Sequence, residues 1–361
     1  MTKAFLSLGL AAISLLAGAC RREGPPPAAP GATGPYAVGI LQSVDSPTAN
    51  ELRRGILQAF AEAGLRDGQE IVVTIRIANN DIAEVQRMAR ELAAGQADLI
   101  IPLSTQALQA AILASSRLPI VFGAVAVPYL VGAGRSADDH LRNVTGVVST
   151  GPIGQTIALI REVLPGARRV GSLWTPSEVN SEYYLDLARE AASQHGLELV
   201  TVPVSGPFEV QASLQRLLNL KVDALFPMSD NTLNSSFDVV GRAAWESGVP
   251  LFASFLRSVE FGACAALGYD FFEMGLRTGR LAVRVKKGER PGQIPIQSMG
   301  EVMLYVNPEA AARQGVVLPP AVLARAARLA AVTFGAAAEP GLAPDRTRRP
   351  TAHRRRARPI G

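Results

Sequence analysis

Two short stretches of the chain carry polar residues whose types and spacing suit ligand binding. Residues 98–111 read DLIIPLSTQALQAA, and residues 223–236 read DALFPMSDNTLNSS. Each stretch has an Asp, a short apolar run, a Pro, and then a small polar cluster where a helix-like segment begins. The first cluster offers neutral hydroxyl and amide groups, whereas the second offers the carboxylate of Asp230. We therefore predict a strand–turn–helix unit that occurs twice, with a ligand between its two copies.

Similar polar clusters follow other predicted strands. In an open parallel sheet, ligands bind beyond the carboxyl ends of the strands, where helix N-termini present unpaired N–H groups. A helix start rich in Ser and Thr suits a carboxylate, and an acid suits an ammonium, so two facing lobes would suit an amino acid or another small zwitterion. The candidate ligand-binding residues are Ser43, Ser104, Thr105, Gln106, Glu178, Asn180, Ser181, Asp230 and Asn231.

Helix capping is the preferred explanation of each cluster when the cluster is taken alone. Ser, Thr, Asp and Asn are ordinary N-cap residues, and each contributes about 1 kcal/mol to stability without any ligand. The ligand interpretation is favoured because four such clusters occupy equivalent points in both halves of the chain. Both interpretations stay open at the level of sequence.

Catalytic signatures are missing from the sequence. There is no Gly-Lys pair for a phosphate-binding loop, no G-x-S-x-G, and no metal-ligand spacing around the three His residues. The dinucleotide-like run at 132–137 precedes Asp138 and Asp139 with no apolar helix behind it, so we interpret it as a loop. Glu178 and Asp230 could form a carboxylate pair for acid/base chemistry, but substrate contact is the preferred interpretation. We expect no catalytic residue, metal or cofactor.

Short apolar runs alternate with helical periodicity along the chain, which is typical of parallel sheets covered on both faces. The predicted strands are 36–41, 70–77, 98–103, 119–125, 169–173, 197–202, 224–228 and 250–254, and the predicted helices are 50–63, 82–94, 105–115, 182–194, 210–218 and 231–247. A third section adds a strand end at 267–270, a helix at 271–287, a strand at 302–306 and a short helix at 308–313.

The predicted fold class is α/β, with two Rossmann-like doubly wound lobes whose parallel sheets are joined by crossover hinge strands. The predicted first lobe comprises residues 36–148 plus 268–290, and the second comprises 149–267 plus 291–330. Residues 331–361 are rich in Ala, Pro and Arg, and we predict a disordered basic tail there. The seven Arg of this tail, set against Glu339 and Asp345, give a net charge of +5. This equals the whole formal charge of +5, so the charge is no argument for nucleic acid.

The N-terminus is typical of an export signal. Lys3 precedes an apolar run at 4–16 that is too short for a membrane span, and Ala17-Gly18-Ala19-Cys20 follows. We expect residues 1–20 to be a signal peptide with a lipobox, so that Cys20 carries lipid, with plain secretion as the alternative. Residues 21–35 would be the tether. Cys264 then has no partner in the chain and is predicted to be a small buried apolar residue.

The chain resembles a known family, the bacterial ABC-transporter substrate-binding proteins of the tryptophan/tyrosine-type group. Members of this group have the periplasmic-binding-protein type I fold. The resemblance covers residues 36–327. It is carried by FAEAGLRDGQ, DLIIPLSTQALQA, LPIVFGAV, RNVTGV, TPSEVNS (175–181), SDNT (229–232) and GYD (268–270). The family's ligand-facing motifs fall on the candidate residues above other than Ser43, and they add Asp270.

One departure from the family pattern concerns charge. Many members have Thr-Asp or Ser-Asp before the Pro that follows the fourth strand, whereas this chain has Ala126-Val127 before Pro128. The expectation of ammonium binding then depends more on Asp230 and Asp270.

The resemblance implies an extracytoplasmic solute-binding component of an ABC importer, periplasmic or anchored to the membrane through Cys20. We expect a monomer that binds a small amino-acid-like or aromatic solute between its lobes and delivers it to the permease subunits. A ligand-sensing partner of a membrane kinase or chemoreceptor is the alternative, and a doubly wound lyase or hydrolase is a third hypothesis.

Overall fold

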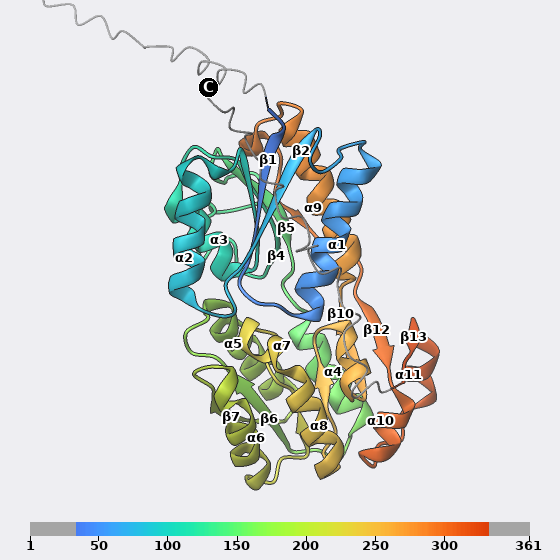
Figure 1. Cartoon of the computed structure of the whole chain (residues 1–361). Helices are drawn as coiled ribbons and strands as arrows, with labels where there is room; N and C mark the ends of the chain where they lie inside the picture. Colours follow the sequence, from blue (N-terminus) through green and yellow to red (C-terminus); the bar gives the residue numbers. More distant parts are fainter. Residues whose placement is uncertain (1–33, 332–361) are drawn as a thin grey trace, which may run out of the picture. The chain divides into compact units, whose positions relative to one another are not determined.

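The computed structural model describes residues 34–331 (Figure 1). The predicted signal peptide with Cys20, the tether up to residue 33 and the tail from residue 332 lie outside these described residues. Within 34–331, no helix is long and apolar enough to cross a membrane.

The first lobe is built on a six-stranded sheet with the order β11-β5-β4-β3-β1-β2, in which every pairing is parallel. Helices α2 and α3 cover one face, and α1 and α9 cover the other (Figure 1). The strands are β1 (Tyr36–Gln42), β2 (Ile71–Ile77), β3 (Leu99–Leu103), β4 (Ile120–Val125), β5 (Val144–Val148) and β11 (Gln297–Ser298). The helices are α1 (Pro47–Glu62), α2 (Ile82–Glu91), the π-helix η1 (Leu92–Gln96), α3 (Thr105–Ala114), α9 (Phe271–Lys286) and the short 3-10 helix η4 (Pro291–Gln293).

The continuous apolar runs in the sequence serve both faces of this sheet. In β3, Leu99 and Ile101 pack with the α1/α9 side, while Ile100 packs with the α2/α3 side. Successive side chains of a strand point to opposite faces, so a strand covered on both sides needs apolar residues at every position. The prediction of a parallel sheet with helices on both faces is therefore confirmed for this lobe.

The second lobe contains two smaller sheets, with the orders β7-β6-β8 and β9-β10-β12-β13, which a parallel bridge between Leu225 and Leu251 connects. Its strands are β6 (Arg169–Trp174), β7 (Glu198–Pro203), β8 (Ala224–Leu225), β9 (Phe252–Ala253), β10 (Ala265–Gly268), β12 (Met303–Val306) and β13 (Arg328–Leu329). Its helices are α4 (Ile153–Val163), α5 (Val179–Gln194), η2 (Pro207–Glu209), α6 (Val210–Asn219), α7 (Asn231–Ser235), α8 (Phe237–Ser247), η3 (Leu256–Phe261), α10 (Pro308–Arg313) and α11 (Pro320–Arg325).

The predicted internal repeat is confirmed by the strand order. The first lobe runs β2-β1-β3-β4-β5, and the second runs β7-β6-β8-β9-β10, which is the same order in each half. The two matched Asp residues also have the same role. Asp98 accepts from the N–H of Ala37 at the start of β1, and Asp223 accepts from the N–H groups of Arg168 and Arg169 at the start of β6.

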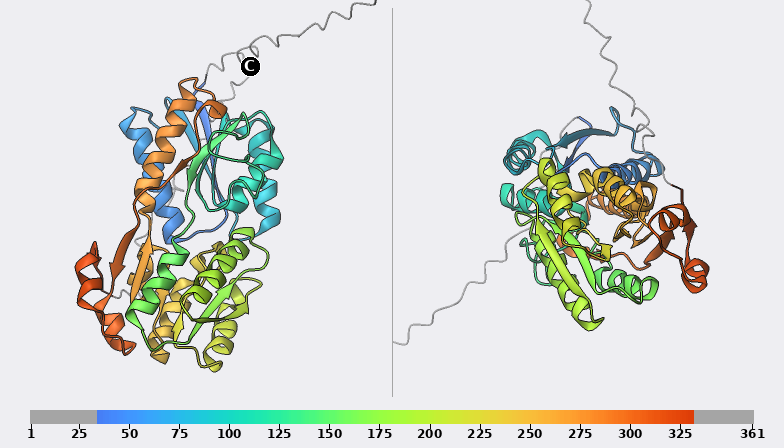
Figure 2. Two further views of the ribbon diagram at one scale, coloured as in Figure 1. Left: turned by 180° about the vertical axis from the view of Figure 1, so that it is seen from behind. Right: turned by 90° about the horizontal axis from the view of Figure 1, so that it is seen from below.

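The chain crosses between the lobes after β5, after β10 and between β11 and β12, as predicted for crossover strands. After β10, helix α9 returns to the first lobe and lies beside α1 in all views (Figure 2). Strand β11 pairs with β5 of the first sheet, although the sequence-based limits assign residues 291–330 to the second lobe. The remaining limits of the two lobes stay a prediction.

Several element boundaries differ from those expected. The predicted helix 231–247 is two helices, α7 and α8, because Ser236 between them leaves helical geometry at φ −120°. Helix α5 begins at Val179 instead of residue 182, so part of the predicted polar loop is its first turn. Helix α4 was not predicted, and α1 begins at Pro47 behind the N-cap Ser46, earlier than expected.

Candidate functional site

A cavity of about 70 Å³ lies where the carboxyl ends of the strands of both lobes meet. Its wall combines the β1–α1 and β3–α3 connections of the first lobe, the start of α7 in the second lobe, and the crossover segments. Five of the ten predicted ligand-binding residues line it: Ser104, Thr105, Asn180, Asp230 and Asn231.

The first-lobe wall is the start of α3. Ser104 caps this helix, because its Oγ accepts from the N–H of Ala107 at 3.1 Å, and it also lies 2.6 Å from the Oγ of Ser43. Ser104 has φ 139°, and the neighbouring wall residue Ala124 has φ 53°. Non-glycine residues in such backbone regions cost on the order of 1–3 kcal/mol each and concentrate at functional sites. The first N–H groups of α3 have no partner within the helix, so this wall can bind an anion.

The second-lobe wall carries Asp230, which is only 1% exposed. Its Oδ1 accepts from the N–H of Leu233 at 2.8 Å, which makes Asp230 the N-cap of α7, and its Oδ2 accepts from the Ser181 hydroxyl at 2.7 Å. Burial raises the pKa of Asp230 well above its ordinary value, and the nearby Glu178 carboxylate raises the pKa further. Ser181 itself does not line the cavity; it also accepts from the N–H of Thr175 and so fixes the position of Asp230.

Glu178 was predicted to contact the ligand, but it does not line the cavity. Its carboxylate is 1% exposed and accepts four hydrogen bonds from the start of α7. The donors are the N–H and Nδ2 of Asn231, at 3.0 and 2.6 Å, and the N–H and Oγ1 of Thr232, at 3.0 and 2.9 Å. Because four donors already occupy this carboxylate, the geometry supports a structural role for Glu178 over acid/base chemistry with Asp230.

Two polar atoms at the cavity wall are buried without a hydrogen-bond partner. They are the Oδ1 of Asn180 and the Oγ of Ser254, on side chains that are 5% and 6% exposed. An unsatisfied buried polar group costs about 1–3 kcal/mol. Both atoms would gain a partner from a polar ligand in the cavity.

Aromatic side chains line the cavity together with aliphatic ones such as Leu52 and Leu103, and the sequence prediction missed the aromatic residues. Tyr184, Tyr269 and Phe271 all line the cavity. The Tyr184 hydroxyl donates to the carbonyl of Ser149 and accepts from the N–H of Gly151, so it ties α5 to the crossover that follows β5. The motif GYD had located this region, but its Asp270 caps α9 through the N–H of Glu273 and does not line the cavity.

The remaining predicted residues lie near the cavity without lining it. Ser43 contacts it only through Ser104. Gln106 lines a separate hollow of about 360 Å³ together with Asn80 and Thr232, and its Oε1 is buried without a partner. The position of a residue within its helix could have separated the residues that line the cavity from those that do not. In both α3 and α7, the N-cap and the first helical residue line the cavity, whereas the second helical residue lines the hollow.

The cavity wall carries a single acidic side chain and no Lys or Arg among the residues that the structure describes. Asp230 is the only Asp, Glu, Lys or Arg among the described residues that line the cavity. Val127, at the position where the family resemblance led us to expect an acid, is buried in the apolar core. The described residues contain no group of three His, Cys, Asp or Glu side chains that could hold a metal ion. Cys264 is buried as predicted, and burial raises the pKa of its thiol to about 12.

Comparison with known proteins decides the family. The model of the ABC transporter substrate binding protein family matches residues 37–330. The chain belongs to this family. It is the extracytoplasmic substrate-binding component of an ABC transporter, and proteins of this kind bind a small molecule, engage a membrane permease and are not enzymes.

Three relatives from this family illustrate the likeness. A tyrosine-binding protein of Clostridioides difficile is 32% identical over 270 residues, which cover 75% of this chain and 78% of the relative. An ABC domain from Streptococcus pneumonia, solved in complex with L-Trp, is 28% identical with a TM-score of 0.78, and the match covers 82% of this chain and all of that one. The ligand-free, open structure of a substrate binding protein with adhesive properties from Clostridium difficile has the same identity and coverage, but its TM-score is 0.62.

Proposed function

We propose that this protein binds a free aromatic amino acid in the cavity and delivers it to the permease of an ABC importer. The observation that carries the proposal is the charge of the cavity wall. A single buried carboxylate, Asp230, lies across from the strained start of α3 at Ser104, so one wall suits an ammonium and the other a carboxylate. The names of the tyrosine-binding and L-Trp-bound relatives support the same ligand class.

The rest of the wall supports an orientation for the ligand. The carboxylate would accept from the first N–H groups of α3 and from Thr105, and the ammonium would donate to Asp230 and to the Oδ1 of Asn180. The side chain would then contact Tyr184, Tyr269 and Phe271, since aromatic rings pack favourably in offset or edge-to-face geometry.

The size of the cavity requires movement before a ligand enters. Ligand pockets usually measure about 300–1,000 Å³, whereas this cavity measures about 70 Å³. The TM-score is also higher against the L-Trp complex than against the open, ligand-free relative at equal identity. We infer that the lobes stand close together here and must separate to admit a ligand.

The experiment is a thermal-shift screen of the twenty L-amino acids, followed by calorimetry. We expect tryptophan or tyrosine to raise the melting temperature most. Asp230→Ala should weaken binding at least tenfold, since it removes a desolvated charge partner worth about 1.4 kcal/mol or more. Asp238→Ala, which removes an exposed acid of α8 that does not line the cavity, is the matched control and should keep the wild-type affinity. No stabilisation by any amino acid at millimolar concentration would refute the ligand class.

We further propose that Cys20 carries lipid and that the protein acts as a monomer. The motivation is the Ala17-Gly18-Ala19-Cys20 run behind a short apolar segment. In cells, Cys20→Ser should move the protein from the membrane fraction to the soluble fraction, and intact-mass measurement should show an acylated N-terminus only for the wild type. An unmodified mature N-terminus on the wild-type protein would favour plain secretion.

The proposed monomeric state has its own test. Sedimentation velocity should give a single species at the mass of one chain.

A further inference from the structure

A hydrogen bond joins the two lobes beside the cavity. The Nδ2 of Asn80, in the turn after β2, donates to the Oγ1 of Thr232 in α7 at 2.9 Å, across 152 residues of sequence. Thr232 is 1% exposed and Asn80 is half-buried, so the acceptor side of this bond is shielded from solvent. We propose that Asn80 and Thr232 form the latch that holds the binding cleft closed, and that Glu178 positions Thr232 for it.

Glu178 decides the direction of this hydrogen bond. A threonine hydroxyl has one proton to donate and two lone pairs to accept with. The Thr232 hydroxyl donates its proton to the Oε1 of Glu178 at 2.9 Å, so its lone pairs are left to accept from Asn80. The buried carboxylate therefore presents the hydroxyl to the first lobe as an acceptor, and only a donor can close on it.

The turn that carries Asn80 is built to hold the donor in place. Asn79 and Asn80 have φ 50° and 66°, a left-handed conformation that Asn tolerates better than most residues. The N–H of Asn80 donates to the carbonyl of Ser43 at 2.7 Å, and the N–H of Asp81 donates to the carbonyl of Ala78 at 3.0 Å. These bonds fix the turn against the β1–α1 connection, so Asn80 is presented to the second lobe without a long flexible segment.

The latch and the cavity share the short helix α7. Asp230 and Asn231 line the cavity, while the next residue, Thr232, lines the hollow of about 360 Å³ with Asn80. Glu178 holds both Asn231 and Thr232 through the four hydrogen bonds described above. A ligand that contacts Asp230 therefore contacts the same rigid element on which the first lobe closes.

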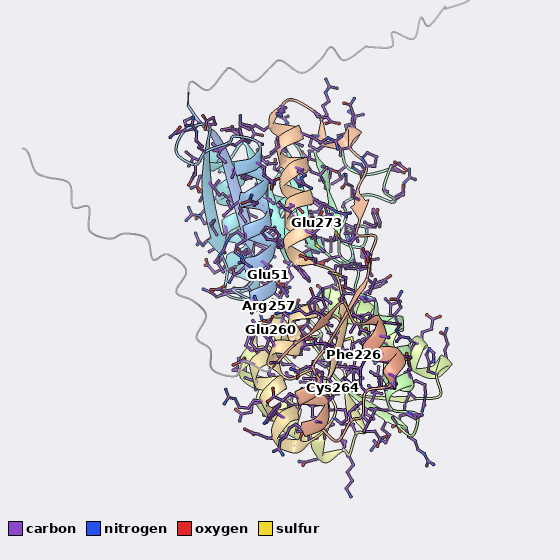
Figure 3. The ribbon with its side chains drawn as sticks, turned by 90° about the vertical axis from the view of Figure 1, so that its right-hand side faces the viewer. Glu51, Phe226, Arg257, Glu260, Cys264 and Glu273 are labelled. Carbon is purple, nitrogen blue, oxygen red and sulfur yellow. The ribbon has the colours of Figure 1, made fainter. Side chains whose placement is uncertain are left out.

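Another polar contact between the lobes is weaker by its geometry. Arg257 and Glu51 form an ion pair of 3.5 Å, and Figure 3 shows both beside Glu260 where α1 faces η3. Arg257 is 33% exposed and also pairs with Glu260 at 2.7 Å, so little of its charge is available to Glu51. A long ion pair whose half-buried Arg is shared with a second, closer carboxylate contributes little to closure. The Asn80–Thr232 bond, whose acceptor is buried and whose donor–acceptor distance is shorter, is the better candidate for control of closure.

The test uses variants that remove the latch without altering the turn. Asn80→Gly deletes the amide and keeps a residue that accepts positive φ, and Asn79→Gly makes the same change at the exposed neighbour as the matched control. Asn80→Asp turns the donor into an acceptor. Thr232→Val deletes the acceptor, and Thr232→Ser restores it. Spin labels on the exposed positions Gln86 (α2) and Gln211 (α6), in a Cys20→Ser, Cys264→Ala background, report the distance between the lobes.

We expect Asn80→Gly and Thr232→Val to reduce the closed fraction and to raise the dissociation rate of L-tryptophan about 3- to 10-fold, the effect of one buried hydrogen bond. Asn80→Asp should raise the dissociation rate more than either of these variants. Asn79→Gly and Thr232→Ser leave the bond intact, so their dissociation rates should stay within about twofold of wild type. For Asn80→Gly, association rates and the melting temperature should change little, which a general loss of stability would not allow, whereas Thr232→Val also removes a donor to Glu178 and should lower the melting temperature.

The latch is overturned if Asn80→Gly and Asn79→Gly show the same distance distribution and the same dissociation rate. This inference depends on the proposed function only for the choice of L-tryptophan. If the wild type does not bind L-tryptophan, the proposed function fails, while the distance distributions of the ligand-free variants still decide on the latch. A closed fraction that falls with Asn80→Gly and recovers with Thr232→Ser relative to Thr232→Val supports it in either case.

Discussion

Asp230 has two roles at the scale of a single residue, since it caps α7 and is the only Asp, Glu, Lys or Arg among the described residues that line the cavity. The N-cap interpretation of the sequence therefore holds for Asp230, and its place at the cavity wall supports the ligand contact that we propose. Glu178 and Asp270, in contrast, are fully explained by capping hydrogen bonds. Sequence could not separate these cases, because all three acids precede a helix and only the folded chain shows which of them faces the cavity.

A pH-dependent stability follows from the buried Asp230. Burial, aided by Glu178, raises the pKa of Asp230 in the folded chain above the ordinary value of 3.8. At pH values between the two pKa values the folded chain holds a proton that the unfolded chain has lost. Asp230 therefore contributes a term that lowers stability as the pH rises from about 3.8 through the raised pKa.

Asp230→Asn removes this term while keeping a good N-cap residue. We expect the ligand-free variant to be more stable than the wild type at pH 8, with a difference that shrinks as the pH falls towards 4. Urea unfolding of both proteins at pH 8, 6 and 4.5 measures this difference, and contributions from other carboxylates cancel in the comparison. If the wild type were more stable than Asp230→Asn at pH 8, burial of the Asp230 carboxylate would not lower the stability of the folded protein.

At the scale of elements, the contact between α1 and α9 depends on glycine. A Cβ on Gly55 would lie 2.1 Å from the carbonyl oxygen of Phe272, and a Cβ on Gly275 would lie 2.1 Å from that of Leu52. The two helices thus pack backbone to backbone. This close contact fixes α9, which follows the crossover from β10, and so it fixes the adjoining Phe271 at the cavity.

Gly55→Ala should lower the free energy of unfolding by about 2 kcal/mol or more, because overpacking of a tight contact costs roughly 1–3 kcal/mol and backbone atoms cannot move aside easily. The control is Gly154→Ala in α4, where the added Cβ would meet Ala191 only at 4.0 Å. Alanine has the better helix propensity, so the control should gain up to about 1 kcal/mol. Urea denaturation midpoints measure whether each substitution lowers or raises the free energy of unfolding. Equal effects of both substitutions would mean that the α1–α9 contact can relax.

Most elements of the first lobe were predictable, because long apolar strands and periodic helices leave a strong local signal. The errors concentrate around α7, where local signal is weak. The run 231–247 has continuous helical periodicity, yet the hydrogen bonds that Glu178 makes to Asn231 and Thr232 hold a separate five-residue helix. Those bonds come from a residue 53 positions away, which no local pattern can show. The short strand β11 was missed for the same reason, and β8, predicted as a strand over 224–228, is paired only at Ala224–Leu225.

For the whole molecule, the internal repeat was the most informative feature of the sequence. Matching Asp98 with Asp223 correctly predicted equal strand positions, and equal strand orders follow in both lobes. The repeat also located the cavity, since the carboxyl ends of the strands meet there. The aromatic side of the wall was not predictable. Tyr184 comes from α5, Tyr269 from the crossover after β10, and Phe271 from the start of α9, so their convergence depends on how the lobes face each other.

The central claim is that the cleft binds a free amino acid through its ammonium at Asp230. Calorimetric titration of L-tryptophan against indole-3-propionic acid, which lacks only the amino group, tests it most directly. We predict that L-tryptophan binds at least a hundredfold more tightly, because the deaminated analogue would leave the Asp230 charge buried without a partner, at a cost of about 3 kcal/mol or more. Equal affinity for the two compounds, or no binding of L-tryptophan at millimolar concentration, would contradict the claim.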